Sequence, residues 1–312
     1  AVFLPSPLWG GSRAESARGG VSGAASLPPA GLRPATSPLQ GEVKKNWLLL
    51  ALAFPAVFIN LGHGHNGFLT AALFAGGLLT LIERPVLAGV LFGCLAYKPQ
   101  FGLLIPLVLV AGGYWRAFVS AAVTVAALAL AVTLAFGTEV WTAFLASATF
   151  TRTVVLEQGD TGWHKIQSVF AWVRMWCGPV GLAYVLQGAA TLIAAAALAF
   201  IWRSRADFTL KAAALLIGTV LATPYALDYD LMLLAPAIAF LATDGIRRGF
   251  APYEKSMLAL LWIVPLFART VPQAVLVPLA VPVMLLSFGL LLHRAMAEPS
   301  AAKARGVLPS TP

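Results

Sequence analysis

Charged residues and cysteines are both scarce in this sequence of 312 residues. Only 11% of the residues are charged, and twelve acidic residues stand against twenty-one Lys and Arg. Because a soluble globular domain carries about 25% charged residues, this scarcity excludes a soluble fold. The two cysteines, Cys94 and Cys177, supply no disulfide framework and no metal-ligand spacing. We therefore predict no structural disulfide, no metal site and no cofactor.

Hydrophobic residues make up 59% of the chain, and its mean hydropathy is +0.84. They come in blocks close to the roughly 17–25 residues with which a helix crosses a bilayer. The blocks are apolar all round, and Ala, Leu and Val dominate them, which favours helices over an outer-membrane barrel. The sequence therefore predicts an all-α integral membrane protein, a polytopic helical bundle.

The net charge of +9 raises the question of nucleic-acid binding. The basic residues are spread singly and in pairs between the hydrophobic blocks, which is typical of cytoplasmic loops that anchor membrane helices. No cluster of basic and aromatic residues offers a surface for stacked bases. We therefore expect membrane lipids around the chain and no nucleic-acid partner.

The chain divides by composition into three parts. Residues 1–44 are rich in Gly, Ser, Pro, Ala and Arg, which predicts a disordered or non-native N-terminal segment. Residues 45–295 form the predicted transmembrane bundle, with one long outer loop at 137–179. Residues 296–312 are predicted to be a disordered cytoplasmic tail.

The bundle is predicted to have about eight crossings plus a re-entrant pair of half-helices. Residues 116–136, 180–202 and 273–292 are the clearest crossings. The hydrophobic blocks are 47–60, 67–82, 86–111, 116–136, 180–202, 210–223, 229–244, 256–268 and 273–292.

The block 86–111 decides the topology. As one helix it is a tilted span of about 39 Å, at 1.5 Å per residue; broken at Lys98, it becomes two half-helices that enter and leave on one side. Pro99 favours the break, because it disfavours helical geometry at Lys98 and removes a backbone donor. With the break, thirteen basic residues collect on the inner side. The five on the outer side are Lys98, Arg152, Lys165, Arg174 and Arg269.

This topology turns the polar motifs toward the outer side. They are the turn Gly62 to Gly67, the residues around Lys98, the loop 137–179 and the segment Thr223 to Asp230. The functional face is therefore expected to be extracytoplasmic, on a multi-pass protein of the plasma (inner) membrane.

Lys98 and Gln100 flank Pro99 at membrane depth. An ionisable residue there is costly and usually faces a cavity or a partner. Lys98 is therefore a candidate to meet an anionic group such as a lipid phosphate, helped by amides freed at the break. The alternative is a lysine that snorkels to the surface and marks a turn.

Asp228 and Asp230 lie two residues apart directly after an apolar helix, with Pro224 as a break and Tyr225 and Tyr229 as interfacial anchors. Such carboxylates can act as a general base, hold a hydroxyl-rich acceptor or cap the following helix. The sequence leaves catalysis and capping both open.

Two further outer motifs are candidates for ligand contact. In the glycine turn, His65 and Asn66 present polar side chains at the membrane surface, and two histidines without a third ligand argue against a metal. In the loop 137–179, Arg152 and His164 lie among aromatic residues. That mixture suits a sugar or a lipid headgroup, and it equally suits an interfacial amphipathic helix.

Several short motifs stand in a distinctive order along the hydrophobic part of the chain. They are Asn66 to Leu73 after the glycine turn, Glu83-Arg84-Pro85, Tyr97-Lys98-Pro99-Gln100, Tyr114-Trp115-Arg116-Ala117, and Thr223-Pro224-Tyr225 through Asp228-Tyr229-Asp230. Each motif is weak alone, but their joint order resembles glycosyltransferase family 87, membrane enzymes of the GT-C superfamily. The resemblance covers roughly residues 47 to 295.

The resemblance implies transfer of a mannose-like hexose from a polyprenyl-phosphate donor to a lipid or glycan acceptor on the extracytoplasmic face. The chemistry is expected to be inverting, with a carboxylate that activates the acceptor hydroxyl. Asp228 and Asp230 are expected to be catalytic, and Lys98 and Gln100 to bind the donor phosphate. The expected substrate-binding residues are His65, Asn66, Tyr225, His164 and Arg152.

One departure from the family pattern bears on activity. Enzymes of the GT-C superfamily carry a catalytic carboxylate in the first outer loop, after the first transmembrane helix. Nothing before Trp47 supplies that helix or loop, and the turn Leu61 to Gly67 holds no carboxylate. The chain is therefore expected to be a fragment that lacks this base, and to be inactive unless Asp228 or Asp230 replaces it.

Two other interpretations stay open. A transporter or lipid flippase would also have broken helices and a lysine near the membrane midplane. Internal symmetry is the discriminating feature, and no repeat relates the two halves of this sequence. The other interpretation is a membrane remnant without enzymatic activity.

Overall fold

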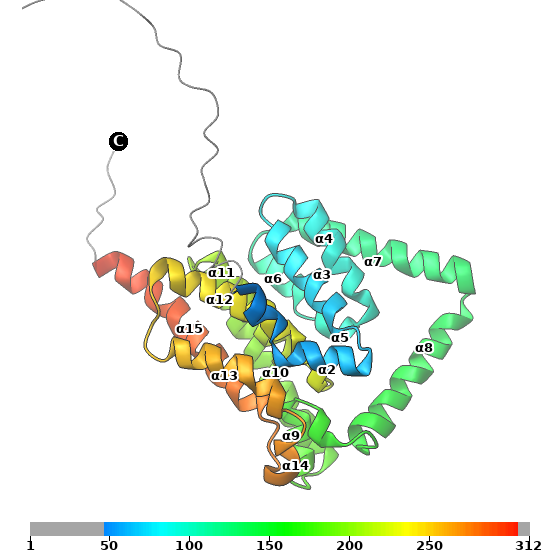
Figure 1. Cartoon of the computed structure of the whole chain (residues 1–312). Coiled ribbons are helices and arrows are strands. Elements are labelled where there is room, and N and C mark those ends of the chain that lie inside the picture. Colours follow the sequence, from blue (N-terminus) through cyan, green and yellow to red (C-terminus); the bar gives the residue numbers. More distant parts are fainter. Residues whose placement is uncertain (1–46, 305–312) are drawn as a thin grey trace, which may run out of the picture. The chain divides into compact units, whose positions relative to one another are not determined.

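The computed structural model describes residues 47–304, and Figure 1 shows the helices that they form. These residues contain no strand, and one isolated β-bridge joins Ile166 to Leu227. The prediction of an all-α membrane protein is confirmed. The segment predicted to be disordered or non-native, residues 1–44, lies outside the described residues.

The described helices follow one another through short connections; η1, η3 and η4 are 3₁₀-helices and η2 is a π-helix. In chain order they are α2 (Pro55–His63), α3 (Gly67–Thr80), α4 (Pro85–Cys94), η1 (Leu95–Tyr97), α5 (Pro99–Gly102), α6 (Ile105–Ala111), α7 (Trp115–Phe136), α8 (Glu139–Phe150), η2 (Thr151–Glu157), η3 (Trp163–Lys165), α9 (Val169–Met175), α10 (Val180–Arg203), α11 (Phe208–Ala222), η4 (Asp228–Leu233), α12 (Leu234–Arg248), α13 (Glu254–Phe267), α14 (Val271–Val275) and α15 (Ala280–Ala304).

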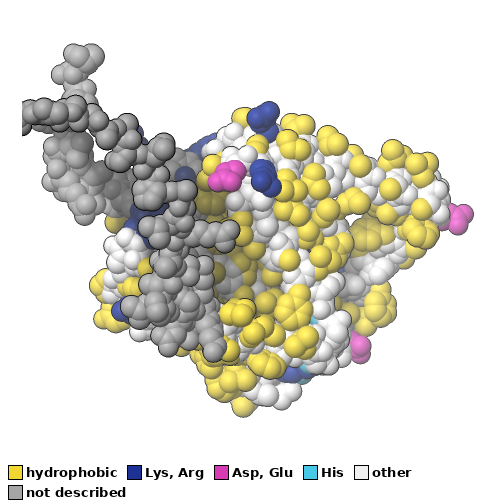
Figure 2. All heavy atoms as spheres, turned by 45° about the horizontal axis from the view of Figure 1, so that its top comes forward, with side chains coloured by type: hydrophobic (Ala, Val, Ile, Leu, Met, Phe, Trp, Pro, Cys, Tyr) yellow, Lys and Arg dark blue, Asp and Glu magenta, His cyan; other side chains and the backbone are white. Residues whose placement is uncertain are grey.

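Four of the described helical segments are long and apolar enough to cross a membrane, judged by length and composition. They are α7, α10, η4 with α12, and the first part of α15. α7 and α10 agree with the predicted crossings 116–136 and 180–202. On the face shown in Figure 2, hydrophobic side chains are abundant and charged ones are few, as expected of a surface in contact with lipid. The chain is a multi-pass membrane protein.

The last predicted crossing, 273–292, starts later than predicted. α14 ends before Leu276, which adopts a left-handed backbone conformation with φ of 55° and so interrupts the helix. α15 starts at Ala280 and continues to Ala304. The predicted boundary at residue 295 between bundle and tail therefore falls inside a helix.

The block 86–111 is broken at Lys98, as predicted. Lys98 has a non-helical backbone, with φ of −131° and ψ of 73°, and Pro99 starts α5. This is the effect expected of a proline, whose ring disfavours helical geometry at the residue before it and whose own φ suits the first position of a helix.

α4 and α7 run side by side in the same direction. The Ser120 hydroxyl donates to the Val86 carbonyl over 2.8 Å, and a Cβ on Gly93 would lie 2.5 Å from the Cβ of Thr124, so this glycine permits the close approach. α6 ends where α7 begins, near the start of α4, so α6 runs antiparallel to α4. The block is thus a helical hairpin with Lys98 at its tip, the form predicted for the re-entrant pair.

The predicted outer loop 137–179 is largely helical, because it contains α8, η2, η3 and α9. No residue of α8 is buried. Arg174 of α9 holds the end of η2 by donating to the Glu157 carbonyl over 3.0 Å, and the Trp163 indole donates to the Leu156 carbonyl over 2.8 Å. These bonds give the second half of this region a fixed structure.

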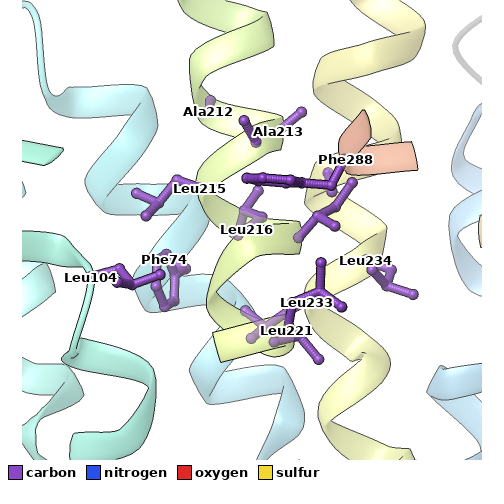
Figure 3. Close-up of a cluster of buried hydrophobic side chains, with 14 of the residues drawn as sticks. Phe74, Leu104, Ala212, Ala213, Leu215, Leu216, Leu221, Leu233, Leu234 and Phe288 are labelled. Atoms are coloured by element: carbon purple, nitrogen blue, oxygen red, sulfur yellow. The ribbon is translucent and has the colours of Figure 1, made fainter. Parts of the chain in front are cut away.

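α11 lies at the centre of the core. Every residue from Ala212 to Ala222 is buried, and α10, α12 and α15 pack around the helix. Small residues allow this approach: a Cβ on Gly218 would lie 3.1 Å from the Phe288 ring of α15. Figure 3 shows side chains of α11 between Phe74 and Leu104 on one side and Phe288, Leu233 and Leu234 on the other.

Two side chains of α10 satisfy the carbonyls at the buried end of α11. Gln187 donates to the Leu221 carbonyl over 3.0 Å, and Thr191 donates to the Ala222 carbonyl over 2.6 Å. Unpaired carbonyls would be costly there, so these bonds permit the helix to end inside the bundle. Pro224 prevents its continuation, and the chain then leads into η4.

The end of α12 far from η4 carries a network of charged residues, which we call the α12 C-terminal cluster. Asp244 pairs with Arg248 over 3.3 Å and with Arg294 over 2.5 Å. Arg248 also pairs with Asp207, and Arg294 also pairs with Glu254. Each arginine therefore bridges two carboxylates, and the network ties α11, α12, α13 and α15 together.

Candidate active site

The segment between α11 and α12 forms the centre of the site. The β-bridge between Leu227 and Ile166 fixes this segment, and the backbone amide of Gln167 donates to the Ala226 carbonyl over 2.7 Å. Asp230 folds back on this segment, because its Oδ2 accepts from the Leu227 amide over 3.0 Å. The cap was predicted at Asp228, with Asp230 in the first turn; in the structure Asp230 satisfies the Leu227 amide from the first turn, and Asp228 Oδ1 accepts from the Tyr229 amide over 3.0 Å.

Asp230 also forms a buried ion pair with Lys98 at the hairpin tip. Lys98 Nζ lies 2.6 Å from Asp230 Oδ1, and the two residues are 8% and 2% exposed. The ammonium lies 4.6 Å from the centre of the Tyr229 ring, within cation–π distance. Because an unpaired buried charge is costly, each of these groups depends on the other. Lys98 is thus a fixed internal cation rather than a snorkelling one.

Asp228 forms the second ion pair, with Arg269 just past the end of α13. Arg269 Nε donates to Asp228 Oδ2 over 2.7 Å; the aspartate side chain is 1% exposed and the arginine side chain 35%. Arg269 Nη1 lies 2.9 Å from His63 Nε2, and His63 Nδ1 lies 2.9 Å from the Ile59 carbonyl. Because a guanidinium only donates, His63 Nε2 accepts from Arg269 in this contact. The Asp228 pair therefore reaches the surface through its arginine.

Three aromatic rings stack at the same end of the bundle. The ring centres of His65 and Tyr229 are 3.9 Å apart, and those of His65 and His63 are 5.6 Å apart. Burial, and then the nearby His63, lower the pKa of His65 below its ordinary value, so His65 is neutral near pH 7. Tyr229 thus lies between the Lys98 ammonium and an uncharged imidazole.

Asn60 ties α2, α3 and η4 together at this end. It is 1% exposed; its Nδ2 donates to the Tyr229 carbonyl over 3.0 Å, and its Oδ1 accepts from the Gly67 amide over 2.9 Å. Gly67 permits this packing, because a Cβ there would lie 2.8 Å from the Tyr229 carbonyl oxygen. The backbone of the residue between the two aspartates is therefore fixed.

Gln167 fixes the backbone next to Arg269. This glutamine is fully buried; its Nε2 donates to the Ala268 carbonyl over 2.7 Å, and its Oε1 accepts from the Ala280 amide over 3.2 Å. Since Ala268 directly precedes Arg269, the arginine is held beside Asp228 by contacts that are independent of its own charge.

Most of the predicted site residues meet at this end of the bundle. Lys98 and Asp230 form an ion pair, and Lys98, Asp228 and His65 each contact Tyr229. Tyr225 and His164 join them more loosely. Tyr225 is half-buried in the same segment, and burial, with Lys165 and Arg269 nearby, lowers the pKa of His164.

Three predicted residues are placed differently. Arg152 has a side chain that is 61% exposed, and it pairs with Glu157 over 3.7 Å. Gln100 is half-buried in α5, beyond the hairpin tip. Asn66 is exposed, and its carbonyl rather than its side chain accepts from the Thr70 hydroxyl. Donor or substrate binding by these residues stays a prediction.

Four site residues are not among those predicted from the sequence: Arg269, His63, Asn60 and Gln167. Arg269 was counted only among the five basic residues of the outer side, although it is a lone cation between two apolar blocks, the same signal that identified Lys98. Asn60 and Gln167 act through backbone carbonyls and amides of distant segments, for which the sequence gives no signal.

A model of glycosyltransferase family 87 matches residues 20–224. The matched region begins and ends earlier than the resemblance over 47–295; it includes Lys98 and stops before Asp228 and Asp230. No curated protein and no solved structure matches the chain. Because the matched region spans more than half of the sequence, the chain belongs to glycosyltransferase family 87.

Proposed function

We propose that this protein transfers a mannose-like hexose from a polyprenyl-phosphate donor to a lipid or glycan acceptor. Enzymes of family 87 act on lipid-linked sugars and on membrane-associated acceptors, which supports this choice of substrates. The reaction is assigned to the end of the bundle that carries Asp228 and Asp230, on the extracytoplasmic face of the plasma membrane. Arg248 and Arg294 at the opposite end of α12 support this orientation, because basic residues favour the cytoplasmic side.

The main support for the proposal is a pair of buried carboxylates with separate cationic partners. Two carboxylates, Asp228 and Asp230, are buried side by side at one end of a membrane bundle, and each is matched to a cation from a distant part of the chain. Buried carboxylates with specific charge partners are common at catalytic sites, where their environment tunes proton affinity. His65, Tyr225 and Tyr229 lie near the two aspartates and offer imidazole and hydroxyl groups that suit a sugar.

Asp228 is the better candidate for the general base. Both aspartates use both oxygens inside the fold: Asp230 with Lys98 and the Leu227 amide, and Asp228 with Arg269 and the Tyr229 amide. They differ in the exposure of the cation, because the Lys98 side chain is only 10% exposed. Asp228 pairs with Arg269, whose side chain is 35% exposed, so an incoming substrate can displace this partner. We therefore assign proton transfer to Asp228 and a positioning function to Asp230.

The chemical step is an inverting displacement. The acceptor hydroxyl oxygen forms a bond to the anomeric carbon of the sugar, and the bond from that carbon to the donor phosphate oxygen breaks. The phosphate leaves with the electron pair, and the hydroxyl proton passes to the Asp228 carboxylate. A positioned general base of this kind contributes about 10²–10⁴-fold to the rate.

The test is transfer by the full chain in liposomes, with a polyprenyl-phosphate mannose donor and a membrane lipid extract as acceptor. The unsubstituted protein should transfer sugar, and Asp228→Asn should lower the rate by about 10²–10⁴-fold while donor binding is retained. Absence of transfer by the unsubstituted chain would contradict the proposal and favour an inactive protein. Loss of transfer in Asp230→Asn with an active Asp228→Asn would exchange the assignments of the two carboxylates.

A further inference from the structure

The two cations of the site differ in what they offer an incoming ligand. Lys98 is 8% exposed, lies against the Tyr229 ring and is bound to Asp230. Arg269 keeps 35% of its side chain exposed. A ligand that reaches this end of the bundle therefore meets the guanidinium of Arg269 before it meets the ammonium of Lys98.

The Nη2 group of Arg269 is available as a further hydrogen-bond donor. Its Nε donates to Asp228 and its Nη1 contacts His63. Across residues 47–304, no group accepts a hydrogen bond from its Nη2. Because a guanidinium presents its donors as a planar fork, the Nη2 edge remains for an acceptor outside the protein.

The fold holds this arginine in position from two sides. The buried Gln167 fixes the carbonyl of Ala268, the preceding residue, and His63 lies 2.9 Å from Nη1 while it is anchored to the Ile59 carbonyl. A guanidinium that is oriented in advance loses little freedom when it binds an oxyanion, and its fork matches the geometry of a phosphate group.

We propose that Arg269 binds the phosphate of the lipid-linked donor, while Lys98 stays paired with Asp230 and positions it. This inference rests on the proposed function and names the residue that recognises the donor's anionic group. It differs from the sequence-based prediction for Lys98 and Gln100, because Lys98 would have to leave its buried partner in order to contact a phosphate.

Phosphate binding at Arg269 also couples the two substrates. The oxyanion shares the guanidinium with Asp228, so the carboxylate interacts less strongly with its cation and becomes a better proton acceptor. When the bond between sugar and phosphate breaks, the charge that develops on the phosphate oxygen is stabilised by the same guanidinium. Donor binding thus prepares Asp228 for the acceptor hydroxyl.

The test measures binding without sugar transfer. The full chain is placed in nanodiscs of phosphatidylcholine, and the dissociation constant for farnesyl phosphate is measured for the unsubstituted protein and for Arg269→Gln, Arg269→Lys and Lys98→Gln. The matched control is Arg248→Gln, because Arg248 has a side chain that is 39% exposed and also pairs with a buried aspartate, at the opposite end of α12. Melting temperatures of all variants report on folding.

We expect Arg269→Gln to weaken binding by about tenfold or more, as for the loss of a hydrogen bond to a charged group. Arg269→Lys should weaken it less, and Arg248→Gln should leave it unchanged. Unchanged binding in Arg269→Gln overturns the inference, as does loss of binding confined to a folded Lys98→Gln protein. No binding by the unsubstituted protein overturns it as well.

Two further measurements complete the test. A competition experiment distinguishes the donor phosphate from other phosphate groups, and a comparison of binding with sugar transfer distinguishes this inference from the proposed function. Inorganic phosphate or phosphatidylglycerol that competes as strongly as farnesyl phosphate overturns the assignment to the donor. Binding of farnesyl phosphate through Arg269 in a protein that transfers no sugar keeps this inference and refutes the proposed function, so the two can fail independently.

Discussion

The two ends of α12 bury carboxylates in different ways. In the α12 C-terminal cluster, Asp244 is shared by Arg248 and Arg294 and also accepts from the Thr209 hydroxyl over 3.1 Å. At the candidate active site, Asp228 and Asp230 each have one cationic partner among the described residues. Asp244 therefore has redundant cations, whereas each aspartate at the site has a single cation besides one backbone amide donor.

This difference separates a structural network from a site that responds to a ligand. In the cluster, an added anion or a lost partner leaves Asp244 compensated by the remaining arginine. At the site, an anion that draws Arg269 away changes the environment of Asp228 at once. Single pairing is unfavourable for stability alone, and it is useful where a charge has to change partners during a reaction.

The largest effect is expected from removal of Lys98. Lys98→Ala leaves the buried Asp230 without its counter-charge, which typically costs about 3–5 kcal/mol. Arg294→Ala at the cluster should cost less, because Asp244 keeps Arg248 and Thr209. Thermal unfolding in detergent measures both variants, and equal losses would contradict the contrast between the two ends.

A double variant removes both members of the Lys98–Asp230 ion pair and so leaves no unpaired buried charge. Lys98→Met combined with Asp230→Leu removes both charges, and replacing a buried pair by apolar residues is often neutral for stability. The double variant should therefore unfold near the unsubstituted protein while its sugar transfer is reduced. Full transfer in a stable double variant would mean that Asp230 has no function in positioning Asp228 and η4.

A smaller effect is expected from Gly67. In Gly67→Ala the new Cβ meets the Asn60 side chain and the Tyr229 carbonyl, so we expect a loss of about 1–3 kcal/mol from overpacking. Gly62→Ala is the control, because a Cβ at Gly62 has no heavy atom within 4 Å. Both melting temperatures are measured; similar values would show that the packing around Asn60 is not tight.

The smallest effect concerns pH. Burial lowers the folded-state pKa of His65 below its ordinary value of 6.5, so the unfolded chain binds this proton more readily. Stability from this group is therefore complete above 6.5 and decreases as the pH falls below it. A melting curve between about pH 7 and about pH 5 should show this fall, which spans the ordinary titration range of histidine. His65→Gln should reduce the fall; an unchanged pH profile would contradict this origin.

The sequence predicts those features that depend on local chemistry. Pro99, together with the distribution of basic residues, predicts the break at Lys98, because a proline acts on the residue before it. Runs of apolar residues predict α7 and α10 within a residue or so, because length and composition decide a membrane span. The two aspartates stand out because carboxylates next to an apolar helix are rare.

The sequence does not predict which partner each charge takes. Lys98 pairs with Asp230, 132 positions later in the chain, and Arg269 pairs with Asp228, 41 positions earlier. These pairings depend on how α2, α3, η4 and α13 pack, which no local pattern encodes. The late start of α15 instead has a local cause, because Leu276 is left-handed and 45% exposed, and Pro278 disfavours helical geometry at the residue before it.

Sugar transfer by Asp228→Asn and Asp244→Asn, measured side by side, is the most direct test of proton transfer by Asp228. Both aspartates are 1% exposed and both pair with arginine, but they lie at opposite ends of α12. We predict that Asp228→Asn loses about 10²–10⁴-fold in rate in a folded protein, whereas folded Asp244→Asn keeps its transfer rate. Equal rates for the two folded variants would contradict this prediction.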